Sequence, residues 1–348
     1  MRTRALAAPP VARVAARLVA SVAAACVLLL GLAGCAVTPS TPAEFSLVQY
    51  PAAGFGGLYA QTSAARKSID MEMYELQDPI EIAKLIAAHH RGVDVRVLLD
   101  SAFEVKASNT AAYLALRAGG VGVRWAPRST IFHIKTTTFD DRTSDISTAN
   151  LTPQYYLTTR DAAIVDSYPV QVSAIVKTFD NDWDGDDPSS DESNAPGLVW
   201  SPNAESAMVN QINSATTSVD FTSEELSDPY IYKALAQDAQ RGVHCRIVMM
   251  DEAEWATAFG VVTSAGCQVH VFPDTAKGLY IHEKLVLVDA DTAKSSAMIG
   301  SQNASYASLA FDRELSIILS GTQAPRVLDS LTSTFNADFA AAKTWPTN

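Results

Sequence analysis

Two short stretches of the sequence hold the residues best suited to chemistry. They read FHIKTTTFD from residue 132 and IHEKLVLVD from residue 281. Each places a His, a Lys two residues later and an Asp five residues after that: His133, Lys135 and Asp140, and His282, Lys284 and Asp289. At strand spacing, residues i and i+2 share a face, so each His and its Lys point into the same space. Two imidazoles facing each other across a cleft could divide phosphodiester chemistry between a nucleophile and an acid.

Polar residues at matching places behind each triplet strengthen this interpretation. An imidazole titrates near neutrality, so it can attack phosphorus when neutral and donate a proton when charged. A Lys ammonium suits the non-bridging phosphate oxygens, to which hydroxyl and amide groups can also donate. A later carboxylate can accept from the His nitrogen that faces away from substrate and fix its tautomer. The candidate phosphate-binding residues are Thr148, Asn150, Ser301 and Asn303, and the candidate orienting acids are Asp161 and Glu314.

The matching places belong to an internal duplication. From residue 68 to residue 93 the two halves correspond at an offset of 150 residues without a gap, and the two His-x-Lys stretches follow at an offset of 149. The matched segments are Ser68–Asp70 with Ser218–Asp220, Asp78–Pro79 with Asp228–Pro229, and Arg91–Val93 with Arg241–Val243. A repeat of this length predicts two lobes of the same fold.

Within each half, strand and helix patterns alternate, which predicts α/β sheets flanked by helices. Buried, β-branched runs favour strands, and a Pro in the first turn favours a helix. In the first half the expected strands are 69–74, 93–99, 121–125, 134–139, 145–147 and 161–165, and the expected helices 79–91, 111–117 and 170–183. In the second half the expected strands are 219–222, 245–249, 268–272, 284–288, 297–299 and 314–319, and the expected helices 204–214, 229–241 and 326–342.

His-x-Lys-x4-Asp followed by Gly-Ser-x-Asn, present twice, resembles the phospholipase D superfamily. The resemblance covers nearly all of the chain after its N-terminal segment. It implies two similar lobes, each a mixed sheet flanked by helices, related by a pseudo-twofold axis with one active site between them. It also implies that no metal or other cofactor is required. The expected boundaries are 45–183 for the first lobe, 184–197 for an acidic linker and 198–348 for the second lobe.

The same resemblance assigns roles to the residues. His133 is the expected nucleophile that forms a phosphohistidine, and His282 the acid and base. Lys135, Lys284, Asn150 and Asn303 match the family's phosphate-binding positions, with Asp161 and Glu314 orienting the imidazoles and Asp140 and Asp289 interpreted as structural. The first motif departs from the pattern, because Ser147 stands for the usual Gly and Thr148 for the usual Ser. Four extra residues also separate Asp289 from Gly300.

The N-terminal segment is expected to be a targeting signal outside the fold. Four Arg and no acidic residue precede position 35, and an apolar run from Leu18 ends at Leu32-Ala33-Gly34-Cys35. This site resembles a bacterial lipobox, which implies cleavage of residues 1–34, lipid on Cys35 and a tether over 35–44. The protein would then be exported and anchored on a membrane surface as a monomer. An ordinary secretory signal and an uncleaved anchor helix are the alternatives.

Charge bears on whether the chain binds nucleic acid or calcium, and cysteine content bears on whether it holds a disulfide. The chain has 26 basic and 38 acidic residues, a formal charge of −12, and only 22 basic residues remain after residue 34, which gives −16. Such a surface repels long polyanions and disfavours nucleic acid as a partner. The acidic segment 184–197 lacks the spacing of an EF-hand, so a solvated linker is favoured over a calcium loop. Cys245 and Cys267 either pair in an oxidising compartment or stay as buried thiols, and the sequence leaves both open.

Three functions compete on these grounds. The leading hypothesis is a tethered phospholipase D-type phosphodiesterase that hydrolyses or transfers phospholipid headgroups. The second is an exported metal-independent nuclease with the same histidines, or a cardiolipin synthase-like phosphatidyltransferase. The third is a membrane-binding module with vestigial motifs, which the retention of both His–Lys pairs disfavours.

Overall fold

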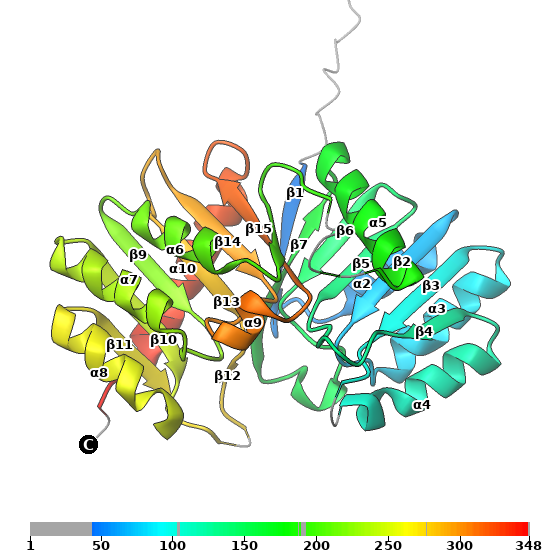
Figure 1. Ribbon diagram of the computed structural model, residues 1–348, viewed down its shortest axis with the longest axis horizontal. Coiled ribbons are helices and arrows are strands. Elements are labelled where there is room, and N and C mark those ends of the chain that lie inside the picture. The colour runs from blue at the N-terminus through cyan, green and yellow to red at the C-terminus, as the bar shows by residue number, and fades with distance from the viewer. Residues whose placement is uncertain (1–43, 103–104, 187, 189–192, 276, 347–348) are drawn as a thin grey trace, which may run out of the picture. The chain divides into compact units, whose positions relative to one another are not determined.

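A computed structural model of the chain describes residues 44–102, 105–186, 188, 193–275 and 277–346. The predicted signal, Cys35 and nearly all of the tether lie outside these residues, as does part of the predicted linker. Two eight-stranded mixed sheets organise the described chain, one built mainly from each half of the sequence (Figure 1). No helix within the described ranges is both long and apolar enough to cross a membrane.

The first sheet has the strand order β1-β7-β6-β5-β2-β3-β4, and β12 from the second half pairs with β7. The strands β2, β3 and β4 run parallel, and the path from β1 to β2 is antiparallel throughout. The bounds are β1 Phe45–Tyr50, β2 Ser68–Met73, β3 Asp94–Leu99, β4 Gly122–Trp125, β5 Lys135–Phe139, β6 Thr143–Ser147, β7 Thr159–Asp166 and β12 Tyr280–Ile281.

The second sheet repeats this topology strand for strand. Its order is β16-β11-β10-β9-β13-β14-β15-β8, so the path from β8 to β11 corresponds to the path from β1 to β4. The bounds are β8 Leu198–Ser201, β9 Ser218–Thr222, β10 His244–Met250, β11 Gln268–Phe272, β13 Lys284–Val288, β14 Ser296–Gly300, β15 Glu314–Ser320 and β16 Lys343–Thr344. The two-lobe α/β fold predicted from the repeat is therefore confirmed.

Two equivalent helices, α3 and α7, begin at an Asp that caps their first turn. Asp78 and Asp228 accept hydrogen bonds from the backbone two residues on, each at 2.7 Å, and a Pro follows each of them in the first helical turn. The helices are α2 Gly56–Ala64, α3 Pro79–His90, α4 Val105–Ala118, α5 Pro169–Asp184, α6 Glu205–Asn213, α7 Pro229–Gln240, α8 Ala256–Ala265, α9 Tyr306–Ala310 and α10 Pro325–Ala341, with 3-10 turns η1 Pro153–Tyr155 and η2 Ala253–Trp255.

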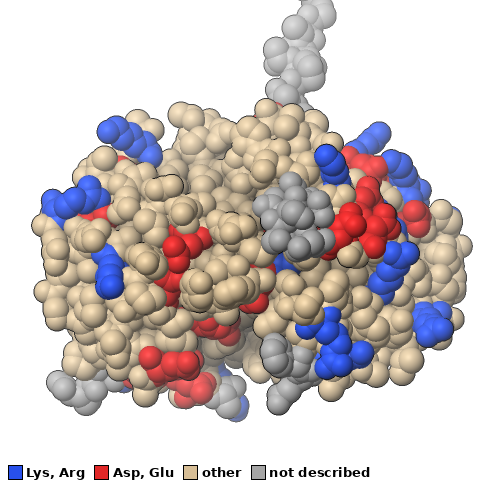
Figure 2. All heavy atoms as spheres, in the orientation of Figure 1, with Lys and Arg blue, Asp and Glu red and all other residues tan. Residues whose placement is uncertain are grey.

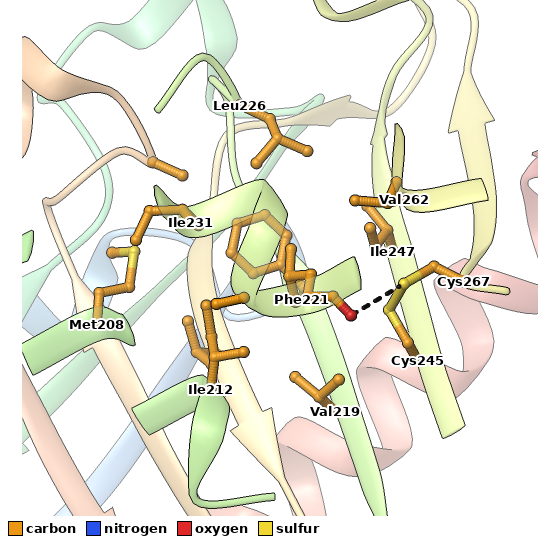
Figure 3. Packing of buried hydrophobic residues seen from close by; sticks show 14 of the residues in the cluster. Met208, Ile212, Val219, Phe221, Leu226, Ile231, Cys245, Ile247, Val262 and Cys267 are labelled. Atoms are coloured by element: carbon orange, nitrogen blue, oxygen red, sulfur yellow. Dashed lines mark hydrogen bonds between the residues drawn. A yellow bond between two sulfur atoms is a disulfide. The ribbon is translucent and has the colours of Figure 1, made fainter. Parts of the chain in front are cut away.

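Three large apolar clusters hold these layers together. One lies between the first sheet and α2, α3 and α4, and a second lies between the second sheet and α6, α7 and α8. The third combines strands of both sheets with α5 and α10, so the two sheets share a core. Figure 3 shows the second cluster, where Phe221 and Ile247 pack beside a disulfide between Cys245 and Cys267. The sequence left the pairing of these cysteines open, and the structure joins them.

Candidate active site

The two His-x-Lys stretches enter equivalent central strands. Lys135 begins β5 and Lys284 begins β13, with each His two residues before the strand. Each ammonium folds back onto the carbonyl oxygen of its own His, at 2.7 Å for Lys135 and 2.5 Å for Lys284. Each His and its Lys are therefore neighbours in space, as the i, i+2 spacing predicts.

Each imidazole is hydrogen-bonded to a carboxylate from the opposite half of the chain. His133 Nδ1 lies 2.8 Å from Glu314 Oε2, and His282 Nδ1 lies 2.8 Å from Asp161 Oδ1. Both carboxylates are buried. Because Nδ1 is occupied in both rings, Nε2 is the nitrogen left for substrate in each.

Backbone contacts between the halves explain why the pairs cross. In each half, the segment that precedes the His is hydrogen-bonded to the segment of the other half that precedes its orienting carboxylate. In one copy Arg313 N donates to Ile131 O at 2.8 Å, and in the other Tyr280 N donates to Thr158 O at 2.9 Å. The parallel pairing of β12 with β7 extends the second contact. These contacts bring the two histidines to the boundary between the halves, close enough that the charges of Lys284 and His282 act on the pKa of His133.

Two arginines reinforce the same crossing. Arg160 forms two hydrogen bonds, of 2.6 and 2.9 Å, with Asp338 of α10. Arg313 forms two of 2.8 Å with Asp182 of α5. Each arginine directly precedes an orienting carboxylate in sequence and holds the closing helix of the other half. Paired guanidinium–carboxylate contacts fix geometry in two directions, so they hold the carboxylates in register.

The first half-site disfavours charge on its imidazole. Burial lowers the pKa of His133 well below its ordinary value, and the charges of Lys135 and Lys284 act in the same direction. Burial and Lys284 lower the pKa of Lys135 to about 7, and burial raises the pKa of Glu314 to about 8. The Tyr74 ring meets His133 edge to face at 4.6 Å and lies 4.9 Å from the Lys135 ammonium. A neutral His133 is thus favoured, as a nucleophile requires.

The second half-site favours a charged imidazole. Burial opposes the charge on His282, but Asp161 and Glu224 outweigh it and raise the pKa above the ordinary value. Glu224 Oε2 lies 3.3 Å from His282 Nε2 and 3.1 Å from Lys284 Nζ. Burial opposes the charge on Asp161 too, but His282 lowers the pKa of this carboxyl. A protonated His282 can act as a general acid.

Two hydroxyls predicted to bind phosphate lie behind the imidazoles. Thr148 is fully buried and its hydroxyl donates to Asp161. Ser301 is also fully buried, and its hydroxyl accepts a 3.2 Å hydrogen bond from Leu315 N. Both hydroxyls are hydrogen-bonded within the fold, because the strands that follow them return over their side chains, and direct phosphate contact by these two residues stays a prediction. Thr148 also helps to hold an orienting carboxylate.

The third member of each motif lies at the opposite end of its strand. Asp140 follows β5 and accepts hydrogen bonds from the backbone N–H groups of residues 66, 67 and 68. Asp289 follows β13 and accepts from those of residues 216, 217 and 218. Both Asp residues have positive φ, of 55° and 50°. They tie the turn after one strand to the loop before its neighbour, which is the structural role expected for them.

A cleft of about 210 Å³ opens beside His282. It is lined by Tyr74, Glu75, Asn150, Thr152, Tyr155, Tyr156, Thr159, Asp161, Glu224, Tyr280 and His282. Asn303, the second predicted amide, reaches the same place, because its Nδ2 lies 3.4 Å from Glu224 Oε2. The sequence did not single out Tyr74, Glu75, Glu224 or Tyr280. Alignment of the two repeats does point to Glu224 and Tyr74, because they occupy equivalent positions, each six residues after the matched serines Ser68 and Ser218.

Comparisons with known proteins agree with this geometry. A sequence model of the family described as "Cardiolipin synthase, PLD-like domain" matches residues 58–183 and 208–339. The mitochondrial cardiolipin hydrolase of Xenopus laevis is 27% identical over 135 residues, which are 39% of this chain and 63% of that protein. The alignment thus spans less than two thirds of this relative.

Solved structures show the same fold. The phosphatidylserine synthase of Haemophilus influenzae superposes with a TM-score of 0.69 at 14% identity, over 86% of this chain and 87% of that one. The polyphosphate kinase of Porphyromonas gingivalis superposes with a TM-score of 0.62 at 15% identity, over 83% of this chain and 50% of that one.

Proposed function

This chain belongs to the phospholipase D-like family of cardiolipin synthase domains, and from that premise we propose that it is a phospholipase D-type phosphodiesterase acting on phospholipid headgroups. The observation that carries the proposal is the pair of crossed histidine–carboxylate contacts with a lysine beside each. The opposite pKa directions of the two imidazoles match a nucleophile and an acid.

The proposed reaction has two steps. His133 Nε2 attacks phosphorus and forms a P–N bond while the P–O bond to the headgroup alcohol breaks, and His282 gives its Nε2 proton to the departing oxygen. A water then attacks phosphorus, gives a proton to His282 and breaks the P–N bond, which frees His133 and a phosphomonoester. The two lysines stabilise the charge on the non-bridging oxygens in both steps.

Transfer to an alcohol is the second candidate, supported by the description of the matching family. An acceptor alcohol would take the place of water in the second step, and the same histidines would serve. Hydrolysis and transfer can be separated by supplying glycerol with a phospholipid and measuring the ratio of phosphatidic acid to the new phosphatidyl ester.

Charge supports a lipid over a nucleic acid. On the face shown in Figure 2, Lys and Arg side chains lie mostly toward the edges, and those of the described residues form no continuous band across it. Long polyanions need such a band for affinity. The test is to assay phosphatidylcholine, phosphatidylglycerol, cardiolipin and single-stranded DNA side by side without added metal. Turnover of a lipid that is lost in His133→Ala is expected, and cleavage of DNA alone would overturn the proposal.

We also propose that the protein is exported and held on a membrane surface by lipid on Cys35, on the strength of the sequence Leu32–Cys35. A Cys35→Ser variant should lose labelling by radioactive palmitate and leave the membrane fraction. Equal membrane association of the two proteins would contradict the lipid anchor.

A further inference from the structure

Glu224 occupies the donors that a substrate phosphate needs. It follows β9, and its Oε2 lies 3.3 Å from His282 Nε2 and 3.1 Å from Lys284 Nζ. Tyr280 donates its hydroxyl to Oε1, which holds the carboxylate in the cleft. Nε2 is the nitrogen of His282 that must reach the leaving oxygen, because Nδ1 is bonded to Asp161. A phosphodiester can therefore bind there only if Glu224 gives up these contacts.

A displaced Glu224 needs a new positive partner. Burial opposes charge on this carboxyl, but His282 and Lys284 outweigh burial and lower its pKa well below the ordinary value, so it is anionic in the free enzyme. Its side chain is only 27% exposed. Once phosphate takes both cations, a partly buried carboxylate is left beside a second anion. An unpaired charge in such surroundings is costly, and like charges at short range repel.

The cleft beside Glu224 has the composition that receives a cation. An acid that protonates the leaving oxygen must lie on the leaving-group side, so the cleft beside His282 receives the leaving alcohol. Four tyrosines line it, and two of them, Tyr155 and Tyr280, have ring centroids 5.9 Å apart. Glu75 and Asp161 bring the number of carboxyl groups lining the cleft to three, and none of the described residues lining it is Lys or Arg. Aromatic faces together with carboxylates bind ammonium groups.

We propose that Glu224 is a specificity residue that selects phosphodiesters whose leaving alcohol carries an amine or a quaternary ammonium group. This inference rests on the proposed function and names the substrate class of the same site. The substrate's phosphate takes the place of Glu224 beside His282 and Lys284. The cation on the substrate's leaving alcohol then becomes the new positive partner of Glu224. A neutral or anionic leaving group, such as glycerol or a second phosphatidyl group, brings no such replacement.

The test uses two substrates of one shape. Short-chain phosphatidylcholine is compared with the phosphatidyl ester of 3,3-dimethylbutan-1-ol, in which carbon replaces the charged nitrogen. The wild-type ratio of kcat/KM for the two should be at least about 10, since one well-placed cation contact is worth that factor. Glu224→Gln, which keeps the shape and removes the charge, should lower this ratio about tenfold.

A matched control separates the effect of the charge in the cleft from the effect of the protein's net charge. Glu254 is an exposed acid in η2 and does not line the cleft. Glu254→Gln changes net charge by the same amount and should leave the substrate ratio unchanged. An unchanged ratio in Glu224→Gln, or a wild-type preference for the neutral ester, would overturn the inference.

Binding distinguishes this inference from the proposed function. Calorimetry on the wild-type protein should show tighter binding of phosphocholine than of 3,3-dimethylbutyl phosphate, because either phosphate displaces Glu224 and only phosphocholine brings it a cation. If phosphocholine binds more tightly while neither ester is hydrolysed, the proposed function fails and the cation site stands. If the esters are hydrolysed while the two phosphates bind alike, the specificity role of Glu224 fails and the proposed function stands. This measurement needs no variant, so it decides even if Glu224→Gln does not fold.

Discussion

The surroundings of His133 and His282 differ although their motifs are copies. His133 has an aromatic neighbour, Tyr74, on the substrate side, whereas His282 has a carboxylate, Glu224, at the equivalent position of the repeat. Tyr74 adds no charge, so burial and the two lysines favour a neutral His133. Glu224 adds a negative charge that, with Asp161, favours a charged His282.

In the proposed mechanism, this difference gives the two copies of a duplicated site separate roles. The residues of the motif are alike in both halves, so they cannot decide which His attacks and which donates a proton. Asp161 raises the pKa of His282 most, and Glu224, a neighbour outside the motif that follows β9, adds to it. An orienting acid and one neighbour together therefore shift the pKa of His282 in the direction opposite to that of His133.

The largest expected effect tests this division of roles with a p-nitrophenyl phosphodiester. His133→Ala should lower kcat/KM by at least about 10⁴-fold, because no P–N bond can form. His282→Ala should still release p-nitrophenol in a burst of about one equivalent per site, because this leaving group needs little protonation, and then stall. A burst from His133→Ala and none from His282→Ala would reverse the assignment.

The orienting carboxylates should differ in their dependence on the leaving group. Asp161→Asn removes the charge that keeps His282 protonated, so hydrolysis of alkyl esters should fall on the order of 10³-fold, and of p-nitrophenyl esters only about 10-fold. Glu314→Gln acts on the nucleophile, so the rates of hydrolysis of alkyl and p-nitrophenyl esters should both fall by a similar factor, about 10². Rate constants for a series of leaving groups provide the measurement. Equal slopes against leaving-group pKa in both variants would contradict distinct roles.

Much of the fold could be predicted because the sequence repeats itself. The matched segments fix β2, α3 and β3 against β9, α7 and β10, and buried β-branched runs mark the central strands. The helices α2 and α8 were not predicted. In α2 two glycines open the helix, and α8 is apolar around most of its surface, so neither shows a clear helical face. The short β12 was missed because it exists only through its pairing with the opposite half.

The site could be predicted only as far as the motif extends. Both His–Lys pairs and both orienting acids followed from spacing, but spacing does not tell which acid contacts which imidazole. That depends on contacts such as Arg313 with Ile131, which join segments far apart in the chain. The burial of Thr148 and Ser301 also depends on how neighbouring strands return over them.

The pH dependence of kcat/KM should report on both half-sites. The alkaline limb reports deprotonation of His282, whose pKa is raised, together with Lys135, whose pKa burial lowers to about 7, and Asp161→Asn should move the contribution of His282 to lower pH. The acid limb reports protonation of the pair formed by His133 and Glu314, and Glu314 is held near a pKa of about 8 by burial. Glu314→Gln should move this limb to lower pH, because the remaining His133 has a lowered pKa. A variant that moves both limbs together would show that the half-sites titrate as one unit.

The smallest expected effect on activity concerns the cores behind the two half-sites. Cys245 and Cys267 are joined across β10 and β11, and the equivalent places beside β3 and β4 hold Val95 and Val121, both buried. The double variant Cys245→Val/Cys267→Val gives the second core the side chains of the first. It should lower the free energy of unfolding by about 2–4 kcal/mol, because the cross-link constrains the unfolded chain. It should leave kcat/KM unchanged, because neither cysteine lines the cleft beside His282. Denaturant midpoints with and without dithiothreitol provide the measurement: the reductant should lower the wild-type midpoint and leave that of the variant in place. A variant as stable as the oxidised wild type would mean that packing alone holds the second core, as it does the first.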